Sequence, residues 1–569
     1  MATSIKNTDF IKHLKNNNFP PGELIIKGLV VVDNSTNIEW NYIIFEGITF
    51  NDSFCINNVD LKSGLYFKNC TFSKGIIFKY IKSTDIRSDF NTSNASLFFD
   101  SCKGSHITLA ENSYLIKGVT FLNSELKQVL IQDSVVINGG INITTSIIFD
   151  LLHVFKVKSD LKLRNSTLKR NFRVETIIGN MSLIDSTFDG VVKFWNIECP
   201  INITFNDNVF NDTVDFESAR IIKGLFIHGD CFNKKFILEN RDLTGNNFDS
   251  YCNEIYITEA KFLEGADFNG LGKSLETLTI NMSPNLLGVI TFTGWNIDST
   301  RLYGINQSLK LLFKRIVFRH VFINEFSNYG DVSFDKCSAN GDSVFSLHNS
   351  DLGTTRFNEF KFNAFIVIRI DNTQLDTIKA SGVEWFEDSK LIIPVDGQTE
   401  SEEYRRRREI YRQIKQALKS NGNQIDSLLF QAKEMKAFRN ELKKGDNYSL
   451  NDRIIMSLNW TNNYGLAWLK PLVIIFIITF LFYALTLPMF SPKLNYTLAK
   501  NSNEVLLTLD ELYNNFHVFW QMFNPTRRFS VVYGNINNGF LQFLDLIHRV
   551  LLGIFIYQII RGFRKFVMK

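Results

Sequence analysis

The chain has 569 residues, a formal net charge of +4 and seven cysteines, among which there is no CxxC pair. This length excludes a single small domain and leaves room for several domains or for one extended repeat array. The cysteine spacing argues against a zinc or disulfide framework, so we expect reduced thiols in a core and no metal site.

Residues 1–40 precede the recognisable repeats, and we expect them to form an N-terminal cap. The first 23 residues, MATSIKNTDFIKHLKNNNFPPGE, contain no apolar segment of the kind found in secretory signal peptides. The expected location of the N-terminal part is therefore the cytoplasm.

An eight-residue phrase recurs through the next 350 residues. Its pattern is apolar, any, apolar, any, turn residue, small residue, any, apolar, as in LYFKNCTF and LKLRNSTL. Copies begin at Leu65, Leu97, Val119, Ile141, Leu161, Met181, Ile203 and Leu225, and weaker copies at Ile255, Val332, Phe345 and Ile368. Successive starts between residues 97 and 225 are 20 or 22 residues apart.

The phrase predicts a short strand followed by a tight corner. Alternating apolar residues give a strand with one buried face. The fifth position is usually Asn, Asp, Ser or Thr, which bend the chain, and the small sixth residue can stack inward. A period of about 20 residues with these features is typical of a parallel β-solenoid, which we place at residues 41–390. The expected fold class is mainly β, and the absence of GxGxxG and GxxxxGK[ST] motifs gives no support for a nucleotide-binding α/β domain.

Two solenoid segments combine cations with aromatic residues. The ligand-binding candidates are Arg164, Lys169, Arg170 and Arg173 in the first segment, and Lys314, Arg315 and Arg319 in the second. Such strips can bind an anionic or single-stranded nucleic-acid ligand, and the alternative is a solvated face of an otherwise acidic array. Acidic residues fall mostly at corners, so we expect no catalytic residues, no enzymatic activity and no cofactor.

A helical region follows a short polar linker. Residues 402–419 and 424–444 have helical patterns separated by Ser420-Asn421-Gly422-Asn423, which predicts an antiparallel hairpin neck at 400–445. Residues 451–468 then predict an interfacial helix, with Trp460 and Trp468 at the level of lipid headgroups. This helix opens a C-terminal domain at 450–569.

Two apolar stretches, residues 471–490 and 540–560, are each long enough to cross a ~30 Å hydrocarbon core as a helix. Residues 401–470 hold 14 Lys/Arg against 8 Asp/Glu, the tail after residue 560 adds four cations, and the loop between the stretches holds four cations against three anions. By the positive-inside rule we expect both termini in the cytoplasm and the loop outside.

The second stretch contains Asp545, His548 and Arg549, which lie within one helical turn of each other, and Gly553 follows one turn later. Ionisable residues in a span usually face a bundle interior or a water path, so these four are our pore and gate candidates. The alternative is an ion pair at the outer membrane surface. Two helices cannot enclose a pore, so this interpretation requires an oligomer, most simply a homotetramer.

The loop between the stretches carries two further signals. Residues 506–523 predict a re-entrant pore helix. Ser530, Val531, Val532, Tyr533 and Gly534 then stand where potassium channels carry a filter-like loop, although Val532 replaces a glycine that such a filter needs. Because of this valine and the neighbouring cations Arg527 and Arg528, we do not expect potassium selectivity, and a chance match is the alternative.

The motifs WLKP at 468–471, FWQMFNP at 519–525 and IYQIIRGFRK at 556–565 resemble bacterial membrane proteins that join pentapeptide-like β-helical repeats to a two-helix, channel-like C-terminus. The layout is similar to that of the channel effectors of Hailong anti-phage defence systems. This resemblance implies a tetrameric pore in the bacterial inner membrane, a nucleotidyltransferase partner, gating by a single-stranded oligonucleotide, and abortive infection through depolarisation.

Two other functions stay open from the residues alone. One is a membrane-tethered β-solenoid scaffold that binds a protein partner, for which the lipid bilayer is only an anchor. The other is a carbohydrate-active β-helix, against which the expected cytoplasmic location argues.

Overall fold

The computed structural model describes residues 3–567 except 17, 21, 34–35, 37, 39, 41–42, 62–63, 84–95, 116, 133–134, 158, 196–197, 200–201, 218–219, 222, 240–251, 395–398, 446–448, 490, 495–500, 535 and 537. The chain divides into two compact units, Met1–Pro394 and Val395–Lys569.

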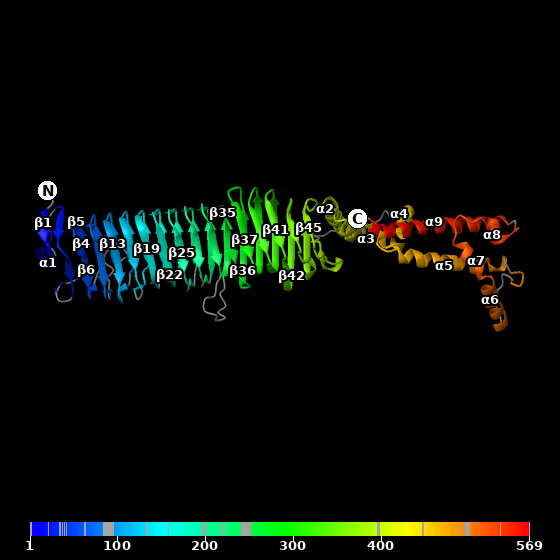
Figure 1. Ribbon diagram of the computed structural model, residues 1–569, viewed down its shortest axis with the longest axis horizontal. Coiled ribbons are helices and arrows are strands. Elements are labelled where there is room, and N and C mark those ends of the chain that lie inside the picture. Colours follow the sequence, from blue (N-terminus) through cyan, green and yellow to red (C-terminus); the bar gives the residue numbers. More distant parts are fainter. Residues whose placement is uncertain are drawn as a thin grey trace. The chain divides into compact units, whose positions relative to one another are not determined.

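The first unit is a parallel β-solenoid, in which strands of successive coils lie side by side (Figure 1). Over the described residues, one of its sheets has sixteen strands joined in parallel. These are β4 (Ile43–Glu46), β8 (Leu65–Lys68), β12 (Leu97–Asp100), β15 (Val119–Leu122), β18 (Ile141–Thr144), β20 (Leu161–Arg164), β23 (Met181–Ile184), β27 (Asn202–Asn206), β31 (Gly224–His228), β34 (Cys252–Thr258), β36 (Ser274–Met282), β38 (Asn296–Asn306), β40 (Val317–Asn328), β42 (Ser338–His348), β44 (Val367–Asp371) and β46 (Leu391–Ile392). We call this the sixteen-strand sheet.

A second sheet, the twenty-four-strand sheet, completes most of each coil. Its described strands are β1 (Thr3–Lys6), β2 (Leu24–Lys27), β3 (Val30–Val32), β5 (Ile48–Phe50), β6 (Phe54–Asn57), β9 (Thr71–Phe72), β10 (Ile76–Lys79), β13 (Lys103–Ala110), β16 (Glu125–Ile131), β19 (Ile147–Val157), β21 (Thr167–Leu168), β22 (Asn171–Ile177), β24 (Thr187–Phe188), β25 (Val192–Trp195), β28 (Val209–Phe210), β29 (Val214–Glu217), β32 (Cys231–Phe232), β33 (Phe236–Glu239), β35 (Lys261–Asn269), β37 (Leu287–Thr293), β39 (Lys310–Lys314), β41 (Asp331–Asp335), β43 (Arg356–Asn358) and β45 (Lys379–Ser381). Short strands add a four-stranded sheet, β7 (Asp60–Leu61), β11 (Lys82–Ser83), β14 (Tyr114–Leu115) and β17 (Val136–Ile137), and a pair, β26 (Glu198–Cys199) and β30 (Arg220–Ile221).

The predicted solenoid is confirmed, and the eight strong copies of the phrase stack in register. Leu97 pairs with Leu65 on one side and with Val119 on the other, and the same register runs on to Ile255. The weak copy at Val332 lies in β41 of the twenty-four-strand sheet, because the phrase describes any strand that ends in a tight corner.

The fifth position of the phrase adopts the left-handed backbone conformation that the corner requires. All seven turn residues that share this position have φ between 47° and 55°, namely Asn69, Ser101, Asn123, Thr145, Asn165, Asp185 and Asp207. Asn and Asp tolerate this conformation better than other residues with a side chain, which explains their frequency there.

The sixth position forms a buried polar ladder along the solenoid axis. The Oγ atom of Ser166 accepts the backbone N–H of Ser146 at 3.2 Å, and the Oγ atom of Ser186 accepts that of Ser166 at the same distance. The ladder continues through Asn208 and ends at Asp230, whose Oδ1 atom accepts the Asn208 backbone N–H at 2.9 Å. The prediction that small residues stack inward is therefore confirmed.

Buried phenylalanines form two stacks along the solenoid, beside buried Leu, Ile and Val side chains. Phe45, Phe67, Phe99 and Phe121 have neighbouring ring centroids 4.8, 4.9 and 5.1 Å apart. A second stack joins Phe188, Phe210, Phe232 and Phe262 at 4.7 to 4.9 Å. These separations match the spacing of neighbouring strands, so each coil contributes one ring to each stack.

The N-terminal cap is shorter than the predicted range 1–40. The described solenoid strands begin with β1, and the helix α1 (Asn7–Lys15) buries Phe10 and Leu14 against the first coils. The strands β2 and β3 belong to the twenty-four-strand sheet and lack the complete phrase, which is why the periodicity did not reveal them. At the other end the unit includes two short 3-10 helices, η2 (Phe362–Ala364) and η3 (Asp388–Lys390).

The second unit begins with the predicted helical hairpin. The helices α2 (Glu400–Ser420) and α3 (Gln424–Lys444) flank a break in which Gly422 has a φ of 78°. Tyr411 and Phe430 meet in the interface, with ring centroids 5.9 Å apart. The Nζ atom of Lys415 lies 2.7 Å from a carboxylate oxygen of Glu434, which adds an ion pair at its edge.

Two long apolar helices dominate the rest of this unit. They belong to α5 (Leu469–Thr486) with the short η5 (Leu487–Met489), and to α9 (Gly539–Val567). The segments Leu469–Met489 and Gly539–Phe563 are long and apolar enough to cross a membrane, by length and composition. The helices pack together through Ile475, Leu552 and Phe555. The other elements are α4 (Leu450–Thr461), η4 (Asn463–Gly465), α6 (Ser502–Asn514), α7 (Phe516–Met522) and α8 (Phe529–Tyr533).

Candidate functional site

The second apolar helix contains a buried carboxylate held by two guanidinium groups. The Nη2 atom of Arg527 donates to Oδ1 of Asp545, and the Nη2 atom of Arg549 donates to Oδ2 of the same carboxylate. The side chains of Asp545 and Arg527 are 2% and 3% exposed, whereas Arg549 is 26% exposed. A buried charge is tolerated only when it is paired and hydrogen-bonded, and both oxygens of Asp545 meet this condition. We call Arg527, Asp545, His548 and Arg549 the ionic cluster.

Arg527 reaches the cluster because the end of α7 orients it. Its Nη1 atom donates to the backbone oxygen of Met522, the last residue of α7, and lies 3.4 Å from the backbone oxygen of Asn524. Exposed carbonyls at a helix C-terminus attract a cation, so the loop after α7 holds the guanidinium in place. This loop is thereby joined to the middle of α9.

His548 connects the cluster to the other long helix. Its Nδ1 atom lies 3.2 Å from Nη2 of Arg527, and its Nε2 atom lies 3.3 Å from Oγ1 of Thr479 in α5. A guanidinium can only donate, so Nδ1 accepts and the proton of a neutral imidazole is on Nε2, directed at Thr479. The ring stacks on Phe482 with centroids 4.4 Å apart.

The structure thus brings together three of the four predicted pore and gate residues. Asp545 and His548 are each 1% exposed and lie inside the subunit. Gly553 is on the surface of α9, where an added Cβ atom would meet no atom within 4 Å. Their role in a pore stays a prediction. Sequence reasoning missed Arg527 as a member of the cluster, although an aspartate inside an apolar helix requires a cationic partner from elsewhere.

The filter-like segment is helical in the structure. Residues 529–533 form the one-turn helix α8, and Gly534 ends it with a φ of 59°. Val532 and Tyr533 are buried in an apolar cluster with Tyr483, Phe519 and Met522. In a helix the backbone carbonyls accept intrahelical hydrogen bonds, whereas a potassium filter presents successive carbonyl oxygens to the ion.

The predicted pore helix at 506–523 is two helices rather than one. α6 ends at Asn514, α7 begins at Phe516, and Asn515 stands between them. Val518, Phe519 and Met522 of α7 are buried, so this helix is packed within the unit. Much of α6 is exposed.

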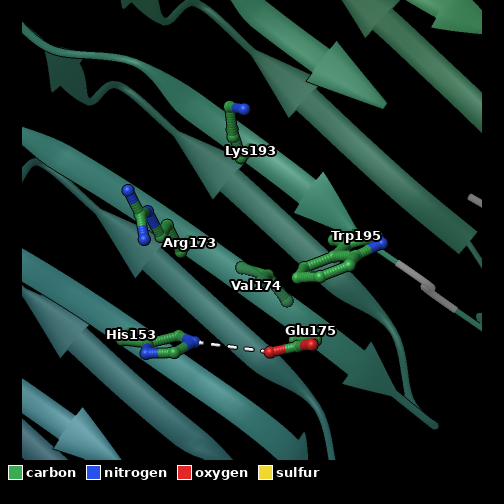
Figure 2. A pocket seen from close by; sticks show the side chains of 6 residues that line it. All are labelled: His153, Arg173, Val174, Glu175, Lys193 and Trp195. Carbon is green, nitrogen blue, oxygen red and sulfur yellow. Dashed lines mark ion pairs between the residues drawn. The ribbon is translucent and has the colours of Figure 1, made fainter. Parts of the chain in front are cut away.

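A second candidate site lies on the outer face of the solenoid. His153 in β19, Arg173 in β22 and Lys193 in β25 are directly in register across three coils. With Glu175 and Trp195 they line a recess of about 300 Å³, which we call the solenoid recess (Figure 2).

The solenoid recess offers cations and an aromatic ring to a ligand. Neither Arg173 nor Lys193 forms an ion pair with a residue that the structure describes. The Nε2 atom of His153 lies 3.7 Å from a carboxylate oxygen of Glu175, and Trp195 is 48% exposed. Two unpaired cations beside an exposed indole can hold an anion and stack a planar ring.

The other ligand-binding candidates lie elsewhere on the solenoid. Lys169 is paired with Asp189 at 2.8 Å, Arg170 approaches Asp150 at 3.5 Å, and Arg319 is paired with Asp298 at 2.9 Å. Arg164 is in the sixteen-strand sheet, Lys314 ends β39, and Arg315 is a corner residue with a φ of 53°. The structure therefore brings only Arg173 into the solenoid recess.

The residues that join Arg173 in the recess are not its neighbours in the sequence, so the local pattern of cations did not reveal them. His153, Arg173 and Lys193 are 20 residues apart, which equals one coil in this region. Cations separated by the repeat length would have revealed the recess.

Across the described parts of the chain, no group of three or more His, Cys, Asp or Glu residues is arranged to hold a metal ion. Comparison with known proteins finds no family model, no curated protein and no solved structure that matches this chain.

Proposed function

We propose that the chain is a subunit of a ligand-gated ion channel in the bacterial inner membrane. In this proposal the segments Leu469–Met489 and Gly539–Phe563 cross the bilayer, both termini are cytoplasmic, and subunits assemble as a homotetramer around an ion path. The ionic cluster carries the proposal, because charged residues inside a membrane span are costly and commonly mark ion pathways. The cluster also joins α5, α9 and the loop between them, so movement of one is coupled to the others.

The ligand proposed to act on the channel is anionic and binds the solenoid recess. Arg173 and Lys193 supply charge for phosphates, and Trp195 supplies a surface for base stacking. A single-stranded oligonucleotide combines both features. The α2–α3 hairpin, which follows the solenoid in the chain, would transmit the bound state to the membrane helices.

The resemblance to anti-phage effectors extends this proposal to a biological role. A partner nucleotidyltransferase would make the oligonucleotide, and opening of the pore would depolarise the infected cell and abort phage growth. Expression of the chain with and without its proposed partner, followed with a potential-sensitive dye during infection, tests this role.

A second candidate function is a membrane-tethered scaffold that binds a protein partner. Its support is the burial of Asp545 and His548 within one subunit, together with the apolar character of the exposed positions on α5 and α9. Residues such as Phe480, Leu481, Val550 and Tyr557 are exposed there, as lipid-facing residues would be.

Reconstitution distinguishes the two functions. Purified full-length protein in liposomes should conduct ions, and Arg549→Gln should change the conductance or the ion selectivity, because Arg549 is the member of the ionic cluster most open to solvent. Arg301→Gln, an exposed cation of β38 in the solenoid, is the matched control. A monomer in detergent that gives no conductance would refute the channel and leave the tether.

A further inference from the structure

Two cations converge on one half-exposed tryptophan at the start of the first apolar helix. The guanidinium carbon of Arg439 in α3 lies 5.5 Å from the ring centroid of Trp460, and Nζ of Lys470 in α5 lies 5.7 Å from the same centroid. Neither cation forms an ion pair with a described residue, and Nε of Arg439 has no hydrogen-bond partner among them. Two like charges at one ring repel each other unless an anion joins them.

The surrounding contacts place this group at one end of the two candidate spans. Lys470 is the second residue of the segment Leu469–Met489. Near it, Nη1 of Arg561 in α9 donates to Oδ1 of Asn459 in α4 at 2.7 Å. Trp468 stacks on Phe563 with centroids 5.2 Å apart. The helix α4 is therefore fixed where α5 begins and α9 ends.

The helix α4 exposes apolar side chains in addition to Trp460. Leu450, Ile454 and Ile455 are each more than half exposed. An exposed apolar surface that continues directly into a membrane span, with cations beside it, is typical of a helix that lies in the lipid headgroup layer.

We propose that Arg439, Trp460 and Lys470 form a binding site for the phosphodiester headgroup of an acidic phospholipid. The phosphate neutralises both cations, while the indole and the apolar residues of α4 contact the upper part of the acyl chains. This inference rests on the proposed membrane insertion. It goes beyond that proposal by naming the class of lipid that binds at Arg439, Trp460 and Lys470.

The test compares lipid retention by full-length variants. Wild-type protein is incorporated into nanodiscs that contain equal amounts of phosphatidylcholine and phosphatidylglycerol, then transferred to detergent, and the retained lipids are counted by native mass spectrometry. Arg439→Gln combined with Lys470→Gln should reduce retained phosphatidylglycerol severalfold and leave phosphatidylcholine unchanged. Lys419→Gln, at the end of α2, removes an exposed charge away from α4 and should retain phosphatidylglycerol like the wild type.

Several outcomes separate the explanations. Equal phosphatidylglycerol retention by the double variant and the wild type would overturn the lipid site. Extraction of the wild-type protein from membranes by alkaline carbonate would instead refute the membrane insertion on which the site depends. If the double variant fails to fold, as judged by gel filtration, phosphatidylglycerol retention is measured for the single variant Lys470→Gln instead. The Lys470 side chain is exposed, so its replacement should not disturb folding, and reduced retention is again expected.

Discussion

Asp230 is the one acidic residue of the buried polar ladder, and its environment favours the protonated carboxyl group. Burial raises the pKa of Asp230 to about 8, although N–H groups of Asn208 and His228 donate to it and oppose this rise. The neighbouring positions of the ladder are neutral, and the next coil places Ala260 there. Among the residues that the structure describes, no cation lies beside this side chain to compensate a negative charge within the core.

The raised pKa makes the stability of the solenoid depend on pH. The folded chain keeps a proton that the unfolded chain releases above about pH 4, where free aspartate titrates. The contribution of Asp230 is fully present below that pH and is lost as the pH rises through 8. Asp230→Asn removes the charge and keeps the oxygen that accepts from Asn208, but its amide nitrogen cannot accept from the His228 N–H. We therefore expect the melting temperature of the variant, relative to that of the wild type, to be higher at pH 8 than at pH 4.

Thermal unfolding of the full chain, followed by circular dichroism at several pH values, measures this effect. Asp342→Asn changes an exposed aspartate of the strand β42 and serves as the control. A variant at Asp230 whose melting temperature follows the wild-type pH profile would contradict the assignment.

At the scale of elements, the solenoid was predictable because each coil repeats the same local chemistry. The alternation in LKLRNSTL specified β20, and Asn165 and Ser166 specified the corner and the ladder. The first coils were not predicted as part of the solenoid, because β2 and β3 have the apolar alternation of the phrase but lack its corner residues. The local sequence therefore identified strands and corners where the complete phrase is present, and it did not identify the first strands of the array.

The ionic cluster was predictable only in part, because its members come from distant segments. The spacing of Asp545, His548 and Arg549 follows from one helix. The pairing with Arg527 depends on how the loop after α7 folds back on α9, and Thr479 is contributed by α5. The sequence contains no period that relates these segments.

The pairing of Arg527 with Asp545 predicts a large loss of stability when the carboxylate is removed. Asp545→Asn leaves Arg527 almost fully buried without a counter-ion, and breaking one side of a buried ion pair costs about 3 to 5 kcal/mol. We expect a lower melting temperature in detergent for this variant. Asp510→Asn, an exposed aspartate of α6, should melt like the wild type.

A double-mutant cycle measures the interaction energy between Arg527 and Asp545 apart from the contacts that each makes with other residues. Arg527→Gln added to Asp545→Asn removes the unpaired charge, so the double variant should be more stable than the sum of the single effects predicts. Strict additivity of the two substitutions would show that the residues do not interact.

At the scale of the whole molecule, the first unit is proposed to bind the ligand and the second unit to conduct ions. The solenoid is suited to the first task because its outer face repeats positions in register, so three coils supply His153, Arg173 and Lys193 to one recess. Stacked coils hold these side chains on a rigid surface. The second unit contains the ionic cluster. To open the proposed pore, a bound ligand would have to change the arrangement of this cluster.

Oligonucleotide binding to the solenoid recess is testable on the full-length protein through its dependence on salt. A fluorescein-labelled single strand should bind more weakly to the double variant Arg173→Gln, Lys193→Gln. If each cation neutralises one phosphate, the slope of log Kobs against log salt should fall by about 1.4. Trp195→Ala should weaken binding by about 1 to 3 kcal/mol with the slope unchanged, because it removes only stacking. Lys169→Gln, whose cation is already paired with Asp189, is the control. Wild-type affinity and slope in the double variant would exclude the recess as the oligonucleotide site.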